Sequence, residues 1–234
     1  MAEKILNGYL ISEYDYKDFD KILTFLTEEK IISCIGMGLK KINSKNSRNL
    51  FIGHLTEIQF FEARLEKKLS RLKKVYLLEA LSKDLIENKT LIFLNKVFEK
   101  IETEKSHVNL LKIYEKFLEL IKSQKYPDLF LVNYLLIKCQ IIFGFKLNYQ
   151  KCSTCGSTQR IYSVSKDDYG ILCYLCSQLA QNPSWTKEAI LLFLYLNRDE
   201  LEKALEYQTG SRLLFAFMQE VYLKLVGVKF SYYE

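Results

Sequence analysis

Residues 20–38 read DKILTFLTEEKIISCIGMG, and this stretch decides the fold class of the N-terminal region. Two runs rich in Ile, Leu, Phe and Thr flank a polar tetrad from Thr27 to Lys30, which predicts two β-strands joined by a tight turn. Comparable strand-like segments cover residues 4–14, 50–65 and 68–78. Four or five strands in about 75 residues suit a small closed barrel.

Beyond about Val75 the apolar residues recur with helical spacing. Pro and Gly are scarce, with 2 and 9 residues respectively, which favours long helices over a turn-rich sandwich. Pro127 suits the first position of a helix, and Ser184 suits an N-cap. The predicted helices cover residues 75–88, 90–104, 106–124, 127–146, 184–197, 199–208 and 211–226.

Four cysteines stand in two pairs, CSTC and CYLC, with 17 residues between the pairs. Each Cys-x-x-Cys can place two sulfurs on one edge of a tetrahedron, so two pairs at this spacing indicate a four-cysteine zinc site. Gly156 permits the positive-φ turn that such a pair needs. Residues 160–172 resemble a β-hairpin that turns at Asp167–Gly170. The predicted ligands are Cys152, Cys155, Cys173 and Cys176.

Four thiolate ligands leave no open coordination position on the metal, so one Zn²⁺ here is expected to be structural and to fold residues 147–182. Two alternatives remain open from the residues alone: unligated buried or reactive thiols, and a redox-active Cys-x-x-Cys, which would not need a second pair. Cys34 and Cys139 lie in apolar segments, where we expect them to be small core residues.

A basic segment, GLKKINSKNSR at residues 38–48, joins the third and fourth predicted strands. No Asp or Glu occurs from Ile31 through Thr56, although the chain holds 28 acidic residues. Solvated loops usually mix charges, whereas a surface that meets phosphates would not; a merely solvated loop remains the alternative. A second basic cluster covers residues 64–74, and the net charge of +6 permits nucleic-acid binding without requiring it. The predicted phosphate contacts are Lys40, Lys41, Lys45 and Arg48.

The sequence holds no recognisable catalytic motif. His54 and His107 stand alone, and neither a dinucleotide-binding nor a phosphate-loop signature occurs. The start, MAEKILNGYL, lacks the apolar run of a signal peptide, and the most apolar window, residues 129–145, is interrupted by polar side chains. We therefore expect a cytoplasmic binding protein without a membrane span and not an enzyme, whose cysteines are thiols or metal ligands.

The order of these features resembles the RecO family of bacterial recombination mediators. Residues 8–46 follow the opening pattern of that family: a strand, an acidic turn, a second strand, a short turn, and a third strand that ends in a small and basic segment. Gly38, Lys40, Lys41 and Ser44 occupy the places of that segment. Paired Cys-x-x-Cys motifs late in the chain also occur in many members. One departure is Lys30, where the family usually has Gly.

The resemblance implies an α+β chain, with an N-terminal OB-fold over residues 1–76. A helical domain follows over residues 77–234 and includes a zinc-ribbon-like insertion at residues 147–182. It implies a protein of the bacterial nucleoid that acts in DNA repair. Such a protein would bind single- and double-stranded DNA, anneal complementary strands and help to load recombinase onto DNA coated by single-strand-binding protein. The implied partners are RecR and single-strand-binding protein.

Several expectations stay open at this point. A zinc-containing RNA-binding protein and a protein-interaction scaffold are the alternatives to DNA repair. Phe51, Phe60 and Phe61 could stack on bases, but strand aromatics more often belong to the core. The acidic C-terminal tail of single-strand-binding protein would need an apolar groove with basic side chains at its rim. Residues 211–227, with Arg212 and Lys224, are one candidate.

Overall fold

The computed structural model describes residues 2–63, 68–101, 110–181 and 185–232. These residues form two compact units, Met1–Lys122 and Ser123–Glu234. The predicted domain boundary between residues 76 and 77 stays a prediction. In the structure, α1 to α3 belong to the same unit as the barrel. Limited proteolysis would test whether the chain is cut near residue 76 or near residue 122.

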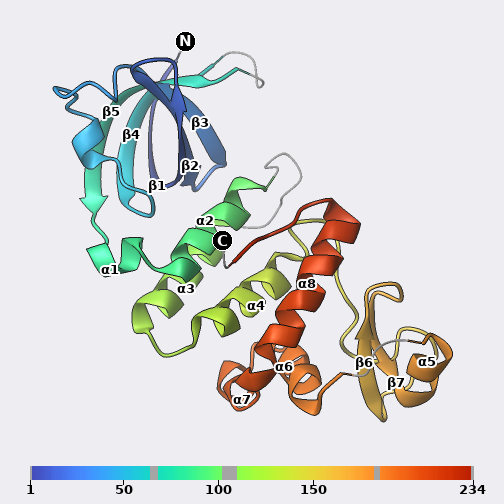
Figure 1. Ribbon diagram of the computed structural model, residues 1–234. Coiled ribbons are helices and arrows are strands. Elements are labelled where there is room, and N and C mark those ends of the chain that lie inside the picture. Colours follow the sequence, from blue (N-terminus) through green and yellow to red (C-terminus); the bar gives the residue numbers. More distant parts are fainter. Residues whose placement is uncertain (1, 64–67, 102–109, 182–184, 233–234) are drawn as a thin grey trace. The chain divides into compact units, whose positions relative to one another are not determined.

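The first unit is built on a closed five-stranded barrel, as the sequence predicts (Figure 1). Its strands are β1 (Glu3–Tyr16), β2 (Asp20–Thr27), β3 (Ile31–Gly36), β4 (Leu55–Phe61) and β5 (Ser70–Glu79). The strand order β1-β2-β3-β5-β4 closes because β1 pairs with both β2 and β4. The single parallel contact, β3 with β5, is only two residue pairs long, Cys34 with Ser70 and Ile35 with Arg71. This is the OB-like arrangement.

Glycine makes the double pairing of β1 possible. Gly8 lies opposite Thr27 on β2 and Thr56 on β4, so it belongs to both ladders. A Cβ atom at this position would lie 2.8 Å from the backbone oxygen of Leu26. Alternate residues of all five strands then fill the barrel interior, in agreement with the period-two pattern. The core residues are Leu10, Leu23, Phe25, Ile32, Cys34, Leu39, Leu50, Ile58, Phe60, Leu72 and Val75.

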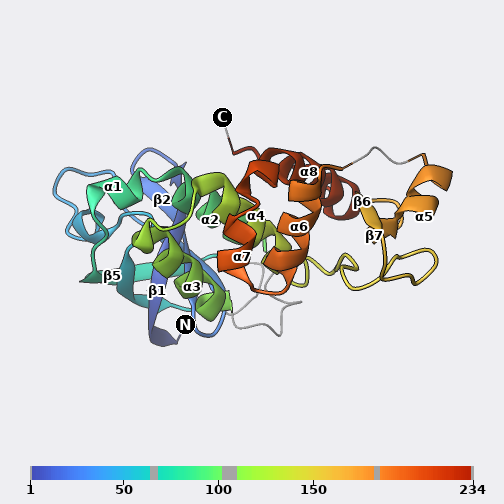
Figure 2. The same cartoon turned by 90° about the horizontal axis from the view of Figure 1, so that it is seen from below.

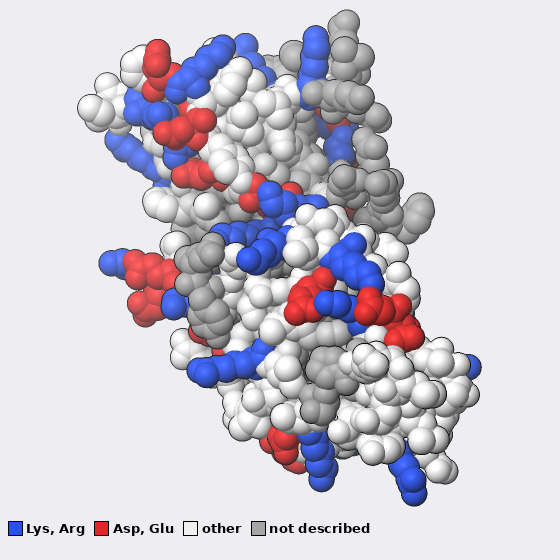
Figure 3. Space-filling view, turned by 45° about the vertical axis from the view of Figure 1, so that its right-hand side comes forward, with Lys and Arg blue, Asp and Glu red and all other residues white. Residues whose placement is uncertain are grey.

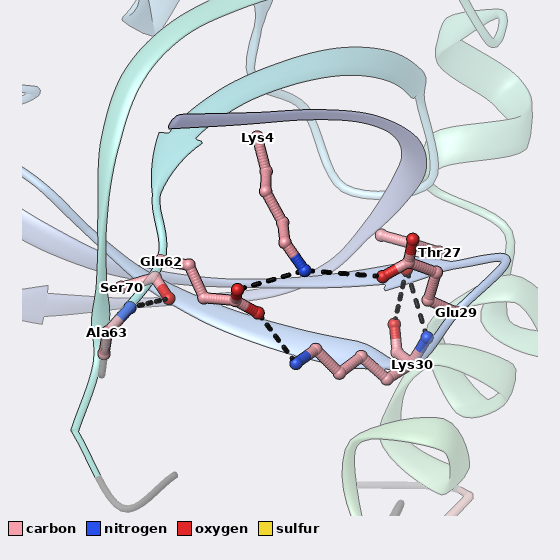
Figure 4. Close-up of polar contacts among 7 residues, drawn as sticks. All are labelled: Lys4, Thr27, Glu29, Lys30, Glu62, Ala63 and Ser70. Atoms are coloured by element: carbon pink, nitrogen blue, oxygen red, sulfur yellow. Dashed lines mark hydrogen bonds and ion pairs between the residues drawn. The ribbon is translucent and has the colours of Figure 1, made fainter. Parts of the chain in front are cut away.

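The β2–β3 turn explains how Lys30 can stand where the related family usually has Gly. The Thr27 hydroxyl donates to the carbonyl of Lys30 (2.7 Å) and accepts from its N–H (3.2 Å), and Lys30 needs no positive φ. Glu62, just after β4, accepts hydrogen bonds from Lys4 and Lys30, and these bonds lower the pKa of its carboxyl group (Figure 4). Side-chain hydrogen bonds thus stabilise this turn, so it does not need a glycine at position 30.

Three helices complete the first unit: α1 (Lys83–Ile86), α2 (Lys89–Glu99) and α3 (Leu110–Ser123). The ring of Tyr114 on α3 lies 4.9 Å from that of Tyr9 on β1, and its hydroxyl donates to Asn95 on α2. The predicted helix over 75–88 is wrong for most of its length, because β5 continues to Glu79. Residues 102–109, which two predicted helices share, lie outside the described residues.

The second unit contains α4 (Asp128–Cys139), α6 (Lys187–Asn197), α7 (Leu201–Leu205) and α8 (Ser211–Val226). α8 has the bounds that the sequence predicts. α4 begins one residue after Pro127 and ends seven residues before the predicted end. The N-cap of α6 is Thr186, whereas the predicted cap, Ser184, lies outside the described residues. The hydroxyl of Tyr222 on α8 donates to the carbonyl of Leu136 on α4 (2.6 Å), so these two helices are firmly joined.

Between α4 and α6 the chain forms the predicted insertion. It contains the hairpin of β6 (Ile161–Ser165) and β7 (Gly170–Cys173), followed by α5 (Tyr174–Leu179). Figures 1 and 2 both show this module at one end of the second unit, beyond α6 and α8. Ion pairs hold the hairpin turn to α8: Lys166 lies 2.5 Å from Glu220, and Lys224 contacts Asp167. Figure 3 shows basic and acidic side chains interspersed on the visible face of the molecule.

Cys34 and Cys139 are fully buried, which confirms them as core residues. Burial raises the pKa of each thiol to about 12. No described helix is long and apolar enough to cross a membrane.

Candidate nucleic-acid interface and metal centre

The basic loop 38–48 is fixed to the barrel at its start. The N–H of Gly38 donates to the carboxylate of Asp20 (2.8 Å), and the N–H of Lys40 donates to the carbonyl of Phe19 (3.0 Å). Gly38 has a φ of +64°, a conformation that other residues rarely adopt. The loop therefore leaves β3 with a defined direction and passes the β1–β2 turn.

Its first two lysines face groups that already interact with them. The Nζ atom of Lys40 lies 2.8 Å from Oδ2 of Asp15, and this hydrogen bond lowers the pKa of the Asp15 carboxyl group. The Nζ atom of Lys41 lies 5.4 Å from the centre of the Phe19 ring. Asp15 would compete with any phosphate for Lys40.

The second half of the loop lies against β5. The Asn46 side chain donates to the carbonyl of Lys73 (3.1 Å) and accepts from the N–H of Val75 (3.2 Å). The Asn49 side chain donates to the carbonyl of Val75 (2.9 Å). Lys45 and Arg48 are exposed next to these anchors, and neither makes an ion pair within the described part of the chain.

The segment of β5 that they meet is itself basic. A bulge after Leu72 shifts the pairing with β4, so that the consecutive residues Lys73 and Lys74 are both exposed. Lys73 pairs with Glu3 (2.7 Å), while Arg71 and Lys74 have no ion pair among the described residues. The loop thus joins the second basic cluster, of which residues 64–67 lie outside the described residues.

The three phenylalanines have different environments. Phe60 is fully buried in the barrel, as expected of a core residue. Phe61 is half-buried, with Lys73 above its ring, and Phe51 is 48% exposed. Tyr76 on β5, which no sequence pattern marked as a candidate, is 44% exposed. Aromatic surface is therefore available near the cations of β5.

The four predicted metal ligands come together. Cys152 and Cys155 lie on the turn before β6, Cys173 ends β7 and Cys176 lies in the first turn of α5. Their Sγ atoms all lie within 4.8 Å of one another, and those of Cys155 and Cys173 are 3.7 Å apart. Four sulfurs at ~2.3 Å from a central Zn²⁺ would be separated by about 3.8 Å, so the cluster can hold this ion.

Local backbone structure supports the cluster. Gly156 has a φ of +75°, as predicted, and its N–H donates to the carbonyl of Cys152 (2.9 Å). Burial opposes ionisation of Cys152, but hydrogen bonds from backbone N–H groups outweigh it and lower the pKa to about 6. Hydrogen bonding with Cys155, together with burial and the other thiols, raises the pKa of Cys176 to about 12. A divalent cation would relieve this crowding of sulfurs.

His54 is buried beside the ring of Phe51 (5.2 Å), and His107 lies outside the described residues.

These observations define a class: an OB-like barrel that carries a basic loop, followed in the chain by helices and a four-cysteine module that could form a zinc site. The chain belongs to the RecO family. The model "Recombination protein O N terminal" matches residues 1–81, and "Recombination protein O C terminal" matches residues 82–225. The family resemblance that was inferred from the opening strands is therefore confirmed, and it extends along nearly the whole chain.

Curated relatives agree with this assignment. A DNA repair protein RecO of Mycoplasma capricolum subsp. capricolum is 27% identical over 184 residues, which cover 74% of this chain and 72% of the relative. Proteins of the same name from Mycoplasma mycoides subsp. mycoides SC and Mesoplasma florum are 23% and 25% identical. They cover 74% and 75% of this chain, and 72% and 68% of the respective relatives.

Proposed function

We propose that this chain is a recombination mediator in DNA repair. It binds single- and double-stranded DNA, anneals complementary strands and helps to load recombinase onto DNA coated by single-strand-binding protein. It works at the bacterial nucleoid in the cytoplasm, has no catalytic residues of its own, and has RecR as a partner. The observation that supports this proposal best is the basic loop on an OB-like barrel, in a chain of the RecO family.

In this proposal Lys40, Lys41, Lys45 and Arg48 contact phosphates. Such contacts release counterions, so affinity should fall as salt is added. Contacts to phosphates position the strand and carry no sequence information, which suits a protein that acts on any damaged DNA. Exposed Tyr76 and Phe51 offer surfaces on which unpaired bases could stack.

The four-cysteine module serves this function indirectly. We propose that one structural Zn²⁺ is held by Cys152, Cys155, Cys173 and Cys176, and that it stabilises the hairpin and α5. Because a closed four-thiolate site has no free coordination position, loss of the zinc is expected to lower stability much more than DNA affinity.

A hollow near the end of α4 is a second candidate site, in addition to α8, for the acidic tail of single-strand-binding protein. On α8, Lys224 pairs with Asp167, whereas Arg212 is exposed without an ion pair among the described residues, and the apolar Leu213 and Leu223 are exposed. A hollow of about 80 Å³ is lined by two isoleucines and two lysines, of which Lys138 also pairs with Asp199 (2.8 Å). The Gln140 side chain there has a buried Nε2 without a partner among the described residues. Its lining residues are Ile137, Lys138, Gln140, Ile141, Lys146, Tyr149 and Asn197.

A direct test compares labelled single-stranded DNA, duplex DNA and RNA of one sequence by fluorescence anisotropy at several salt concentrations. The proposal expects salt-dependent binding to both DNA forms and faster annealing of complementary strands. Equal or tighter binding to RNA without annealing would favour the RNA-binding alternative. The absence of binding at low salt would leave the interaction scaffold.

A further inference from the structure

The edge of β5 is completed by side chains instead of a strand. Its ladder with β3 ends at the pair Ile35 and Arg71, while its ladder with β4 continues to Glu79. From Lys73 onward, the backbone groups that point away from β4 would lack a strand partner. Asn46 and Asn49 supply three of the missing hydrogen bonds, to the carbonyl of Lys73 and to both backbone groups of Val75.

Asparagine is chemically suited to this task. The Asn46 amide uses its oxygen and its nitrogen at once, one to accept from Val75 and the other to donate to Lys73. Neither Asp nor Ser offers both groups in this fixed geometry. The Asn49 nitrogen donates to the carbonyl of the same residue, Val75, on the same edge of the strand. Since Asn46 precedes the short 3₁₀ turn Ser47–Asn49 and Asn49 is its last residue, the two asparagines fix its orientation against the strand.

The anchors carry two cations with them. Lys45 precedes Asn46, and Arg48 precedes Asn49, so each cation is covalently next to an anchor. On the strand side, Arg71 and Lys74 are exposed within two residues of the anchored backbone. Loop and strand lie side by side in Figure 1.

We propose that Asn46 and Asn49 are positioning residues for nucleic-acid binding. They hold Lys45 and Arg48 beside β5, so that these cations and Arg71 and Lys74 form one strip that follows the sugar-phosphate backbone of a single strand. This inference rests on the proposed function and adds to it residues that carry no charge. A loop already held in place loses less conformational entropy on binding than a free one, so the anchors raise affinity without touching the ligand.

The test uses the full-length chain with Asn46→Ala and Asn49→Ala combined. Asn43→Ala is the matched control, because Asn43 is exposed in the same loop and has no hydrogen bond among the described residues. The measurements are the affinity for a labelled oligo-dT strand across salt concentrations, and hydrogen exchange at the Val75 amide. If the four cations of the strip each meet one phosphate, together they contribute about 2.8 to the log–log salt slope, and the double variant loses about 1.4 of that contribution.

A second arm establishes that the anchors act through the loop cations. Lys45→Ala with Arg48→Ala should weaken binding by about tenfold at low salt in the unaltered chain, but much less in the double-Asn variant. If the double-Asn variant does not fold, Asn49→Ala alone, which removes a single hydrogen bond, is used in the same cycle. Thermal unfolding monitored by circular dichroism verifies the fold of every variant.

The outcomes separate the inference from the function on which it rests. Faster exchange at Val75 with a reduced slope supports the positioning role. Faster exchange with unchanged affinity and slope overturns it and leaves DNA binding intact, and unchanged exchange shows that the anchors do not hold the loop, with the same consequence. If the unaltered chain does not bind the oligonucleotide at low salt, the proposed function itself fails.

Discussion

The ammonium group of Lys40 lies 2.8 Å from the carboxylate of Asp15, across the β1–β2 turn. The pair divides the basic loop into two parts with different electrostatic roles. In the unbound chain, Asp15 partly neutralises the charge of Lys40. Lys40 would have to leave Asp15 to contact a phosphate. Lys45 and Arg48, seven and ten residues from Gly38, have no ion pair among the described residues.

The two halves of the loop should therefore contribute unequally. Replacing all four cations with Ala should weaken DNA binding and flatten the salt slope by about two to three. Of this loss, Lys45→Ala with Arg48→Ala should account for more than Lys40→Ala with Lys41→Ala. Anisotropy titrations of the two double variants measure the difference. Equal losses would show that Asp15 does not hold Lys40 back.

Removing the acid should have the opposite effect. Asp15→Asn keeps the size of the side chain but frees Lys40, so single-strand affinity and the salt slope should both rise, the slope by about 0.7. Stability should hardly change, because an exposed ion pair contributes little to folding. Asp18→Asn, on the same turn, is the matched control for the general change of charge. An equal gain in both variants would indicate a general charge effect.

Zinc removal should affect stability more than DNA binding. Purified protein should carry one zinc per chain, and Cys173→Ser should lose it, because a three-thiolate site binds the ion less tightly. Thr158→Ala, an exposed neighbour in the same module, should retain the metal. Elemental analysis and thermal unfolding check both statements. Protein purified without chelators that carries no metal would contradict the structural role.

The buried His54 should make stability depend on pH. Burial lowers the pKa of its imidazole, so the folded chain keeps it neutral at pH values where the unfolded chain, with a pKa near ~6.5, takes up a proton. This contribution is present above the unfolded pKa and is lost as the pH falls through it toward the folded pKa. His54→Gln should therefore lose less stability than the unaltered chain between pH 7.5 and pH 5 in urea unfolding. Parallel curves for the two proteins would argue against this role.

Gly8 should tolerate no larger side chain. In Gly8→Ala the new methyl group would lie 2.8 Å from the backbone oxygen of Leu26, so one of the two β1 ladders must shift. We expect a loss of about 1–3 kcal/mol in the free energy of unfolding. Denaturant unfolding measures this loss. A variant as stable as the unaltered chain would show that β1 relaxes freely at the crossing point.

The features that the sequence predicted correctly are those encoded by local patterns. Two strand-forming runs around the Thr27–Lys30 turn were enough for the hairpin, and the spacing of the cysteine pairs was enough for the cluster of four sulfurs. Cys173 and Cys176 are brought to the other pair by a hairpin whose turn, Asp167–Gly170, was also visible in the sequence. Short-range chemistry determines each of these elements.

The features that it missed depend on residues far apart in the chain. The run VYLLE after Lys74 suits either a helix or a strand, and only the pairing with β4 makes it a strand as far as Glu79. Asn46 meets residues 27 and 29 positions later, and Asp15 meets Lys40 from 25 positions away. Local sequence patterns do not reveal contacts between residues that are so far apart in the chain.

The two-pair seam between β3 and β5 has a consequence for how the barrel assembles. The ladders of β1 with β2 and β4 contain many residue pairs, whereas the β3–β5 seam contains two, Cys34 with Ser70 and Ile35 with Arg71. Bringing distant segments together costs chain entropy, and two pairs return little for it, so this seam is expected to form last during folding. By the same reasoning, the β3–β5 pairing is expected to open first in the native state. The barrel would then open locally at this seam while its antiparallel ladders stay intact.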